Sequence, residues 1–473
     1  MQSQSHNFIG RARKGLTDTD LQQALARFQT GFTVKRSEAA ARLPEFEALR
    51  DKAVEIKNHS LDHLDFYLDR FAGKVEESGG EVHWCVTPEE ARQTVLKICQ
   101  AAGAHSATKS KSMIGEEIAL NPFLEEHNIE PIETDLGEYI VQLAEEYPSH
   151  IIAPAIHKTK DQVSDLFYEH HKDKGAGKRL EEVEELVSEA RHMLRERFIA
   201  ADVGITGANF LIAETGTTAI VTNEGNGDLT QILPRVHIVL ATLEKVVPTL
   251  DDMTTILRIL ARTATGQEFS TYTTLSTGPK RPDDVDGPDE FHVILLDNGR
   301  SKLLGSDYRE ILRCIKCGAC MNHCPVYGSI GGHAYGWVYP GPMGAVLTPN
   351  LVGLKEAHHL PNASTFCGRC EAVCPVRIPL PGLMRKLREE EFAAKLLPPR
   401  YRMGLGLWAW LARHPGLYRL AAGIGRRWMR MRAGRQGRLA SLPFAAGWTA
   451  GRDMPAPEGG SFHKAWRKHG GRV

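Results

Sequence analysis

Seven of the nine cysteines lie between Cys314 and Cys374, and this clustering constrains the chain more than any other feature. It favours a metal site over a disulfide framework, because disulfide frameworks are typical of small secreted domains. The first four cysteines follow the spacing C-x2-C-x2-C-x3-C-P, and the last three follow C-x2-C-x3-C-P. This is the spacing of bacterial ferredoxins, in which thiolates hold two cubane iron–sulfur clusters. A structural zinc site fits less well, since two separated C-x2-C pairs would complete its four ligands.

In ferredoxins of this kind, the cysteine that precedes the proline ligates the other cluster. This crossed rule gives four cysteines to cluster one and three to cluster two. Cluster one is expected to take Cys314, Cys317, Cys320 and Cys374, and cluster two is expected to take Cys324, Cys367 and Cys370. The 42 residues between the two groups are more than small ferredoxins have, and they suggest helices inserted between the halves.

Cluster two lacks a fourth cysteine at the expected position, where Ser364 stands. Several interpretations stay open: Ser364 is a weak oxygen ligand, or His358 or His359 replaces the cysteine. Alternatively, the fourth iron is open to solvent or substrate, or it is absent and the cluster is 3Fe-4S. We favour an open or labile corner, because an alkoxide binds iron less well than a thiolate.

Strands that alternate with helices predict an α/β domain around a largely parallel sheet over residues 71–300. Its first helix has a clear start, with Thr87 as N-cap and Glu90 closing a capping box. Strands are expected at residues 81–86, within 201–222, at 237–241 and at 292–296, and helices at 88–102, 136–147 and 179–198.

Three further segments flank this domain. Residues 1–70 have the apolar periodicity of helices, and residues 301–390 form the helical dicluster ferredoxin module that carries the cysteines. Residues 391–473 form a basic helical tail with 16 Lys and Arg against 3 Asp and Glu, a net charge of +13. The chain as a whole has a net charge of zero, so the preceding residues carry −13.

Composition excludes several classes of protein. The chain is 42% apolar and 25% charged, as is ordinary for a globular protein, and 473 residues are enough for two or three domains. The N-terminus lacks the apolar region of a secretory signal, and no run reaches the ~18 apolar residues of a membrane span. We therefore expect a cytoplasmic protein, in which thiolates stay available to iron. No G-x-G-x-x-G follows a strand, so tight binding of NAD or FAD is not expected.

Two glycine-rich turns, at residues 213–218 and 222–228, follow apolar runs. Turns of this kind expose backbone N–H groups that can hold a carboxylate or phosphate. The simpler interpretation is a pair of tight β-turns in which glycine adopts positive φ, and the pattern alone favours it.

The strings that contain these turns carry a family resemblance. GITGANF and AETGTTAIVTNEGNGDL within residues 201–248 closely resemble the LUD domain, as do KSKSMIGE at 109–116 and ETDLGEY at 133–139. A LUD domain followed by a two-group ferredoxin module resembles the lactate utilization protein B family over nearly the whole chain. The second cysteine group without its leading cysteine is also typical of that family.

The resemblance implies a LUD domain with a fold like that of the sugar-phosphate isomerase and CoA-transferase superfamily. It implies an iron–sulfur subunit that acts with two partners, a cysteine-rich subunit and a second LUD-domain protein. Together they would convert L-lactate to pyruvate. CoA transferases of that superfamily use a glutamate in a comparable turn, but the role is not transferred to Glu224, since lactate oxidation needs no thioester.

No catalytic base is identified on this chain. His105, His157 and His237 lie near the LUD strings, and each is better explained as a structural or surface histidine. Lys109 and Lys111 could pair with a substrate carboxylate, although a solvated charge pair at a helix end is the simpler interpretation. Two rival functions remain: a subunit of another 2-hydroxy-acid or quinone-linked dehydrogenase, and a non-catalytic iron–sulfur redox sensor.

The basic tail combines arginines with Trp408, Trp410 and Trp428. It could fold back on the acidic body, dock an acidic partner subunit, or lie at the inner face of a membrane as a peripheral contact. Nucleic-acid binding ranks last, because no recognised nucleic-acid motif accompanies the charge.

Overall fold

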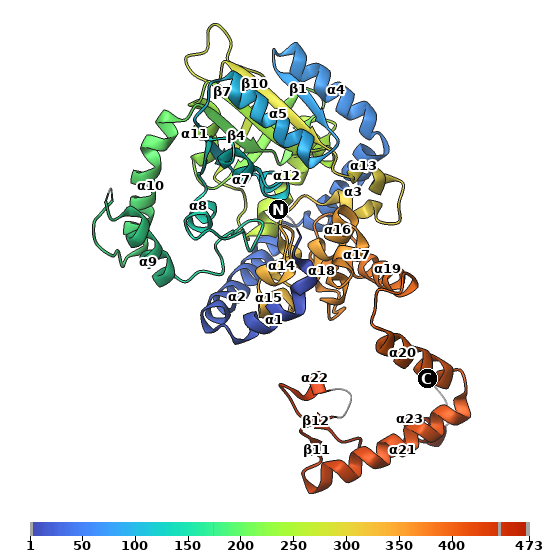
Figure 1. The fold of residues 1–473 in the computed structure, drawn as a ribbon. Coiled ribbons are helices and arrows are strands. Elements are labelled where there is room, and N and C mark those ends of the chain that lie inside the picture. Colours follow the sequence, from blue (N-terminus) through green and yellow to red (C-terminus); the bar gives the residue numbers. More distant parts are fainter. Residues whose placement is uncertain (1–2, 174, 443–445, 470–473) are drawn as a thin grey trace. The chain divides into compact units, whose positions relative to one another are not determined.

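The centre of the α/β domain is a six-stranded sheet in the order β1-β10-β7-β4-β2-β3, with every neighbouring pair parallel (Figure 1). The computed structural model describes residues 3–173, 175–442 and 446–469. The predicted α/β fold with a largely parallel sheet is confirmed. The strands are β1 (Glu81–Cys85), β2 (Ser106–Ser110), β3 (Glu130–Glu133), β4 (Val203–Gly207), β7 (Val236–Thr242) and β10 (Glu290–Leu296).

Both faces of this sheet are buried at its central strands β4, β7 and β10, as is expected for a parallel sheet covered by helices. Ile238 and Ile294 point to the face covered by α5 (Pro88–Ala101) and α7 (Leu120–Glu125). Their chain neighbours Val239 and Val293 point to the face covered by α4 (Leu64–Glu77). Successive side chains of a strand alternate between faces, so these near-continuous apolar runs fill two cores at once.

A second, mixed sheet in the order β8-β5-β6-β9 lies beside the first in the fold. Its strands β5 and β6 lie between β4 and β7 in the chain, whereas β8 and β9 follow β7. The sheet packs on α12 through buried side chains that include Phe210, Ile212 and Met253. The elements are β5 (Phe210–Ile212), β6 (Thr217–Thr222), α11 (Asn226–Ile232), η2 (Leu243–Lys245), β8 (Val246–Val247), α12 (Leu250–Ala264) and β9 (Tyr272–Ser276).

The order of the six strands creates a switch point between β2 and β4. From β2 the chain proceeds outward to β3, whereas from β4 it proceeds in the opposite direction to β7. In open α/β sheets, ligands bind outside the carboxyl ends of the strands at such a point. Lys111 and Ala208 follow the two strands there. Gly207 packs so closely on the turn at Lys111 that a Cβ at this glycine would lie 2.5 Å from the Lys111 carbonyl oxygen.

The cysteine-bearing module is a set of short helices that shares a core with the N-terminal helices. Buried Leu25, Phe46 and Ile56 belong to the same apolar cluster as Tyr327 and Met343. The N-terminal helices are α1 (Phe8–Thr17), α2 (Thr19–Ala41) and α3 (Phe46–Asp62). The module contains α13 (Arg300–Leu304), η3 (Arg309–Arg313), α14 (Ala319–Asn322), α15 (Tyr327–Ile330), η4 (His333–Tyr335), α16 (Gly341–Val352), α17 (Leu354–Ala357), η5 (Leu360–Asn362), α18 (Arg369–Ala372) and α19 (Leu380–Ala393).

Three helices pack beyond the edge strand β3 around the buried Phe167 and Leu186. They are α8 (Leu136–Leu143), α9 (Lys160–His171) and α10 (Val183–Ala200), and α6 (Met113–Glu117) lies between β2 and α7 in the chain. The helix expected over residues 136–147 is therefore too long. It ends early because Glu145 adopts a left-handed conformation with φ of +52°, a common way to terminate a helix.

The predicted start of α5 is confirmed in part. The Thr87 side chain accepts a hydrogen bond from the Glu90 N–H at 3.2 Å, as an N-cap should. The Glu90 carboxylate, however, accepts from the Val86 N–H at 2.7 Å and not from Thr87, so the reciprocal bond of the capping box is shifted by one residue.

Residues 392–473 form a unit of their own. Its helix α20 buries none of its side chains, and Trp408 and Trp410 on it are 62% and 52% exposed. Among the described residues, no helix combines the length and the apolar character needed to cross a bilayer. The unit contains α20 (Pro399–Ala412), α21 (Pro415–Ala433), the strand pair β11 (Arg438–Leu439) and β12 (Met454–Pro455), α22 (Ala446–Thr449) and α23 (Phe462–Lys468).

Candidate functional site

The four cysteines expected for cluster one lie close together, since Cys314 raises the pKa of the thiols of the other three. Burial raises the pKa of the Cys317 thiol, and Cys374 and Cys314 raise it further. Burial also raises the pKa of Cys320, with added effects from Cys314, Cys317 and Cys374. Crowded, buried thiols that oppose one another's ionisation fit a metal centre, because a bound cation supplies the charge that makes them thiolates.

Backbone N–H groups point at two of these sulfur atoms. The Lys316 N–H donates to Cys314 Sγ at 3.4 Å, and the Ile378 N–H donates to Cys374 Sγ at 3.4 Å. Hydrogen bonds to the sulfur atoms are among the features that set the reduction potential of an iron–sulfur cluster. Lys316, in the gap between Cys314 and Cys317, has φ of +57°, a left-handed conformation that is uncommon for residues other than glycine.

The three cysteines expected for cluster two form a second group. Burial raises the pKa of Cys370 to about 12, with further effects from Cys324 and Cys367. Cys367 is exposed, and a hydrogen bond from the Arg369 N–H lowers the pKa of its thiol. Because Cys370 also raises the pKa of Cys320 in the first group, the two groups are neighbours. Which cysteines share a cluster stays a prediction.

The position expected for the fourth ligand of cluster two faces a small cavity. Ser364 lines it together with Cys324, Cys367 and Cys370, and the Ser364 hydroxyl accepts a hydrogen bond from the Phe366 N–H at 3.1 Å. Neither His358 nor His359 is among the described residues that line this cavity, and His358 Nδ1 instead pairs with the Glu391 carboxylate at 2.6 Å.

His323 lines the same cavity and was not considered from the sequence. Its Nδ1 lies 3.0 Å from the Ala319 carbonyl oxygen, which leaves Nε2 as the atom available to the cavity. The sequence signal was its position directly before Cys324.

Two arginines from the N-terminal helices, the buried Arg50 and the half-buried Arg36, hold the second cysteine group in place. Arg50 donates from its guanidinium to the Cys374 carbonyl oxygen at 2.7 Å and to the Ala372 carbonyl oxygen at 2.9 Å. Arg36 donates to the Val373 carbonyl oxygen at 3.1 Å. The loop before the proline is thus tied to α2 and α3, and the N-terminal helices take part in the site.

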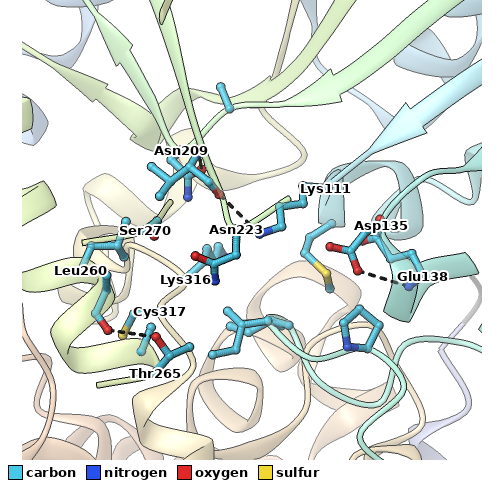
Figure 2. A pocket seen from close by; sticks show the side chains of 18 of the residues that line it. Lys111, Asp135, Glu138, Asn209, Asn223, Leu260, Thr265, Ser270, Lys316 and Cys317 are labelled. Carbon is cyan, nitrogen blue, oxygen red and sulfur yellow. Dashed lines mark hydrogen bonds between the residues drawn. The ribbon is translucent and has the colours of Figure 1, made fainter. Parts of the chain in front are cut away.

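A cavity of about 140 Å³ lies between the α/β domain and the cysteines expected for cluster one. Figure 2 shows Lys111 and Lys316 reaching toward it, with Cys317 to one side and Asp135 and Glu138 to the other. The remaining residues that line it include Met113, Ile151, Ile152, Asn209, Asn223, Lys245, Leu260, Thr265, Gln267, Ser270 and Tyr339. A predicted ligand of cluster one and the strand ends of the α/β domain therefore line the same cavity.

Lys245 and Lys316 line the cavity, and sequence reasoning singled out neither of them. Lys245 lies closest in the chain to the end of β7. It sits in η2 directly after β7, and its ammonium donates to the Ala208 carbonyl oxygen at the end of β4. Burial lowers the pKa of Lys245 to about 8. Lys245 begins the string KVVPT, which resembles the LUD domain, but the string does not mark the lysine itself. Its place at the cavity depends on where β7 ends.

The interpretation of Lys109 as half of a solvated charge pair is wrong. Lys109 is buried, and its ammonium lies 2.9 Å from a Glu116 oxygen and 2.7 Å from a Glu133 oxygen. These carboxylates outweigh burial and raise the pKa of Lys109. Lys111 differs, because it lines the cavity and its ammonium donates a long bond, 3.4 Å, to the Val221 carbonyl oxygen.

The three histidines near the LUD strings lie away from the cavity lining. Burial lowers the pKa of His237 to about 3, and its Nε2 lies 2.9 Å from the Thr206 hydroxyl. His157 pairs with the Glu146 carboxylate at 2.6 Å, and His105 precedes β2 at the opposite end from Lys111. Burial raises the pKa of Glu224, and the nearby Asp135 raises it further, so this glutamate lies by the same strand ends as the cavity.

A buried ionic network joins the α/β domain to the module beside the cavity. Arg300 binds both oxygens of Glu117, at 2.9 and 2.7 Å, and reaches Glu244 at 3.2 Å. The Tyr339 hydroxyl donates to Glu117 at 2.5 Å. Arg300 lowers the pKa of Glu117 to about 2 although burial opposes this.

The α/β fold, the paired cysteine groups and two matching domain families together define the class of protein to which this chain belongs. The chain matches the LUD domain over residues 68–296 and the 4Fe-4S dicluster domain over residues 310–378. It is an iron–sulfur electron-transfer protein built on a LUD domain. Residues 385–471 match the C-terminal region of lactate utilisation protein B.

Similar proteins of known name identify the family of the chain within this class. Lactate utilization protein B of Lysinibacillus sphaericus is 41% identical to this chain over an aligned length of 490. The alignment covers 99% of this chain and 98% of the relative. The chain belongs to the lactate utilization protein B family. An Escherichia coli relative described as the uncharacterized electron transport protein YkgF is 39% identical, with 98% and 97% covered. A crystal structure of a DUF162 family protein from Deinococcus radiodurans aligns with 49% of this chain and 98% of its own, at 16% identity and a TM-score of 0.26.

Proposed function

We propose that this chain is the electron-transfer subunit of a multi-protein system that oxidises L-lactate to pyruvate. The observation that carries the proposal is the position of Cys317, a predicted cluster ligand that also lines the cavity at the strand ends of the LUD domain. The name of the relatives, lactate utilization protein B, supplies the metabolite.

Oxidation of a hydroxy acid to an oxo acid releases two electrons and two protons. An iron–sulfur cluster carries one electron at a time, so two neighbouring clusters on one chain suit a two-electron oxidation. The chain's own residues would enclose the centres: Arg50 and Arg36 fix the second cysteine loop, and the network around Arg300 fixes the module against the LUD domain.

Two partner proteins belong to the proposal, a cysteine-rich subunit and a second LUD-domain protein. The unit 392–473 is the proposed docking element, because it is strongly basic while the rest of the chain is acidic. A peripheral contact with an anionic membrane is the second use of the same surface, and sedimentation with anionic vesicles at low and high salt tests it. We also propose that cluster two has an open or non-cysteine corner at the cavity lined by Ser364.

Growth of a strain that lacks this chain tests the function. The full chain should restore growth on L-lactate, and Cys320→Ala should not, while growth on pyruvate should be the same in every strain. Restoration on another 2-hydroxy acid but not on L-lactate would make the chain a subunit of a different dehydrogenase. Unchanged growth on L-lactate after deletion would favour the redox sensor.

Iron and sulfide analysis with EPR spectroscopy tests the cofactors. About eight irons per chain with reduced-cubane signals would agree with two complete clusters. About seven irons with a three-iron signal in the oxidised state would place the incomplete corner at cluster two. Zinc without iron would exclude electron transfer altogether.

A further inference from the structure

The cavity beside Cys317 has the position of a ligand site. Lys111 follows β2, Asn209 follows β4 and Lys245 follows β7, so the lining comes from the carboxyl ends of adjacent parallel strands. These ends flank the switch point of the sheet, where open α/β sheets bind their ligands. Lys111 also has φ of +47°, and non-glycine residues held in this conformation cluster at functional sites.

Three lysines give the cavity a cationic wall. Lys111, Lys245 and Lys316 line it, and none of the three forms a salt bridge within the part of the chain that the structure describes. Glu244 acts on Lys245 through space but forms its ion pair with Arg300. Lys316 lies over the Tyr339 ring, with 4.4 Å from its ammonium nitrogen to the ring centroid. An ammonium group has three donors, and a single carbonyl acceptor leaves donors of Lys111 and Lys245 for a ligand.

The opposite side of the cavity carries the acidic side chains of Asp135 and Glu138 (Figure 2). Glu138 is 6% exposed, lines the cavity, and its Oε2 has no hydrogen-bond partner among the described residues. Buried polar atoms are nearly always paired, so an unpaired one at a cavity wall indicates a ligand or water. A ligand with a carboxylate at one end and a hydroxyl or carbonyl oxygen nearby would satisfy both sides.

The size of the cavity limits the ligand. A volume of about 140 Å³ corresponds to roughly ten water molecules at 10–15 Å³ each, whereas sites for drug-sized ligands reach 300–1,000 Å³. A small organic acid fits this space, and a dinucleotide does not. Cys317 in the wall brings such an acid next to the predicted cluster one.

We propose that this cavity binds a small 2-hydroxy or 2-oxo monocarboxylate, with Lys111 and Lys245 holding the carboxylate and Glu138 facing the oxygen on the second carbon. The carboxylate assignment stands on the cavity itself, and the second oxygen rests on the proposed function. The LUD domain is then the part of the chain that presents the acid to the iron–sulfur module.

Equilibrium dialysis of the full, cluster-loaded chain against radiolabelled L-lactate and pyruvate tests this site. The wild type should bind at least one acid, Lys245→Met and Lys111→Met should each weaken binding at least tenfold, and Lys280→Met should not change it. Lys280 is a matched control because it is a partly exposed lysine paired with Asp289 outside the cavity. Iron content and circular dichroism equal to those of the wild type establish that each variant is folded.

The EPR spectrum of the reduced chain gives a second readout. Pyruvate should change the spectrum of the wild type and of Lys280→Met but not that of Lys245→Met, because the acid lies beside Cys317. No binding at about 10 mM, ten times the upper end of ordinary KM values, would overturn the proposal, as would full binding by both cavity variants.

Growth on L-lactate separates this site from the proposed function. If Lys245→Met and Lys111→Met restore growth like the wild type, the chain works in lactate oxidation but binds no substrate here. If the cavity variants lose pyruvate binding but deletion of the whole chain leaves growth on L-lactate unchanged, the binding site is supported and the proposed role in lactate oxidation is refuted.

Discussion

Arg300→Met is expected to destabilise the chain strongly, because it removes one partner from a buried ionic network. Arg300 is 1% exposed and binds Glu117 through two nitrogens, while a third nitrogen reaches Glu244. Without the guanidinium, the two buried carboxylates of Glu117 and Glu244 lose the cation that contacts both of them.

Two arguments give the size of the effect. Removing one partner of a buried ion pair costs about 3–5 kcal/mol. Independently, the network lowers the pKa of Glu117 from its ordinary 4.5 to about 2, and each pH unit is worth about 1.4 kcal/mol, so the carboxylate gains about 3 kcal/mol. Because the pKa is lower in the folded chain, this stabilisation is fully present above pH 4.5 and is lost as the pH falls toward 2.

Urea denaturation at pH 7 under anaerobic conditions measures the loss, followed by tryptophan fluorescence and by the visible absorbance of the clusters. With a slope of about 3 kcal/mol per M, the midpoint should fall by about 1 M or more. Arg179→Met is the control, because Arg179 pairs with exposed Asp165 and Glu181, and it should cost less than about 1 kcal/mol.

The double variant Glu117→Gln with Arg300→Met should be more stable than Arg300→Met alone, since it leaves one buried charge fewer. The reasoning is refuted if Arg300→Met lowers the midpoint no more than Arg179→Met does. It is also refuted if the costs of the two network substitutions simply add, because coupled partners do not behave independently.

Three further outcomes are expected. Gly207→Val should weaken pyruvate binding in the dialysis assay, because a Cβ there meets the Lys111 carbonyl oxygen at 2.5 Å and must displace that turn; unchanged binding would contradict this packing. Cys374→Ser and Cys367→Ser should each lose the EPR signal of a different cluster, with Cys374→Ser affecting cluster one, and loss of the same signal in both would contradict the crossed ligand assignment. Binding of pyruvate should weaken as the pH rises through about 8, because burial lowers the pKa of Lys245 to that value and an uncharged amine no longer attracts a carboxylate. Lys245→Met should lack this pH dependence in the same dialysis assay.

Local patterns predicted the elements of the α/β domain well. Residues 237–241 and 292–296 are strands because apolar side chains on both sides of the pleat have cores to fill, and they lie in β7 and β10 of the folded chain. Thr87 and Pro88 mark the start of α5 because an N-cap and a first-turn proline act within one turn of helix. The end of α8 was missed, because a left-handed Glu145 leaves no comparable mark in the sequence.

The spacing of the cysteines determined the kind of cofactor by itself, because two-residue gaps set the distances between thiolates along one short loop. Only the tertiary structure decided which side chains and which cavity lie next to those cysteines. Lys109 and Lys111 are two residues apart, yet one is neutralised in a buried ion pair and the other lines the cavity, because Lys109 lies within β2 and Lys111 lies in the turn after it. Lys245 and Cys317 line the same cavity because the sheet brings the end of β7 close to the cysteine-bearing module. Such proximity between distant segments depends on how apolar faces pack, and local periodicity does not reveal it.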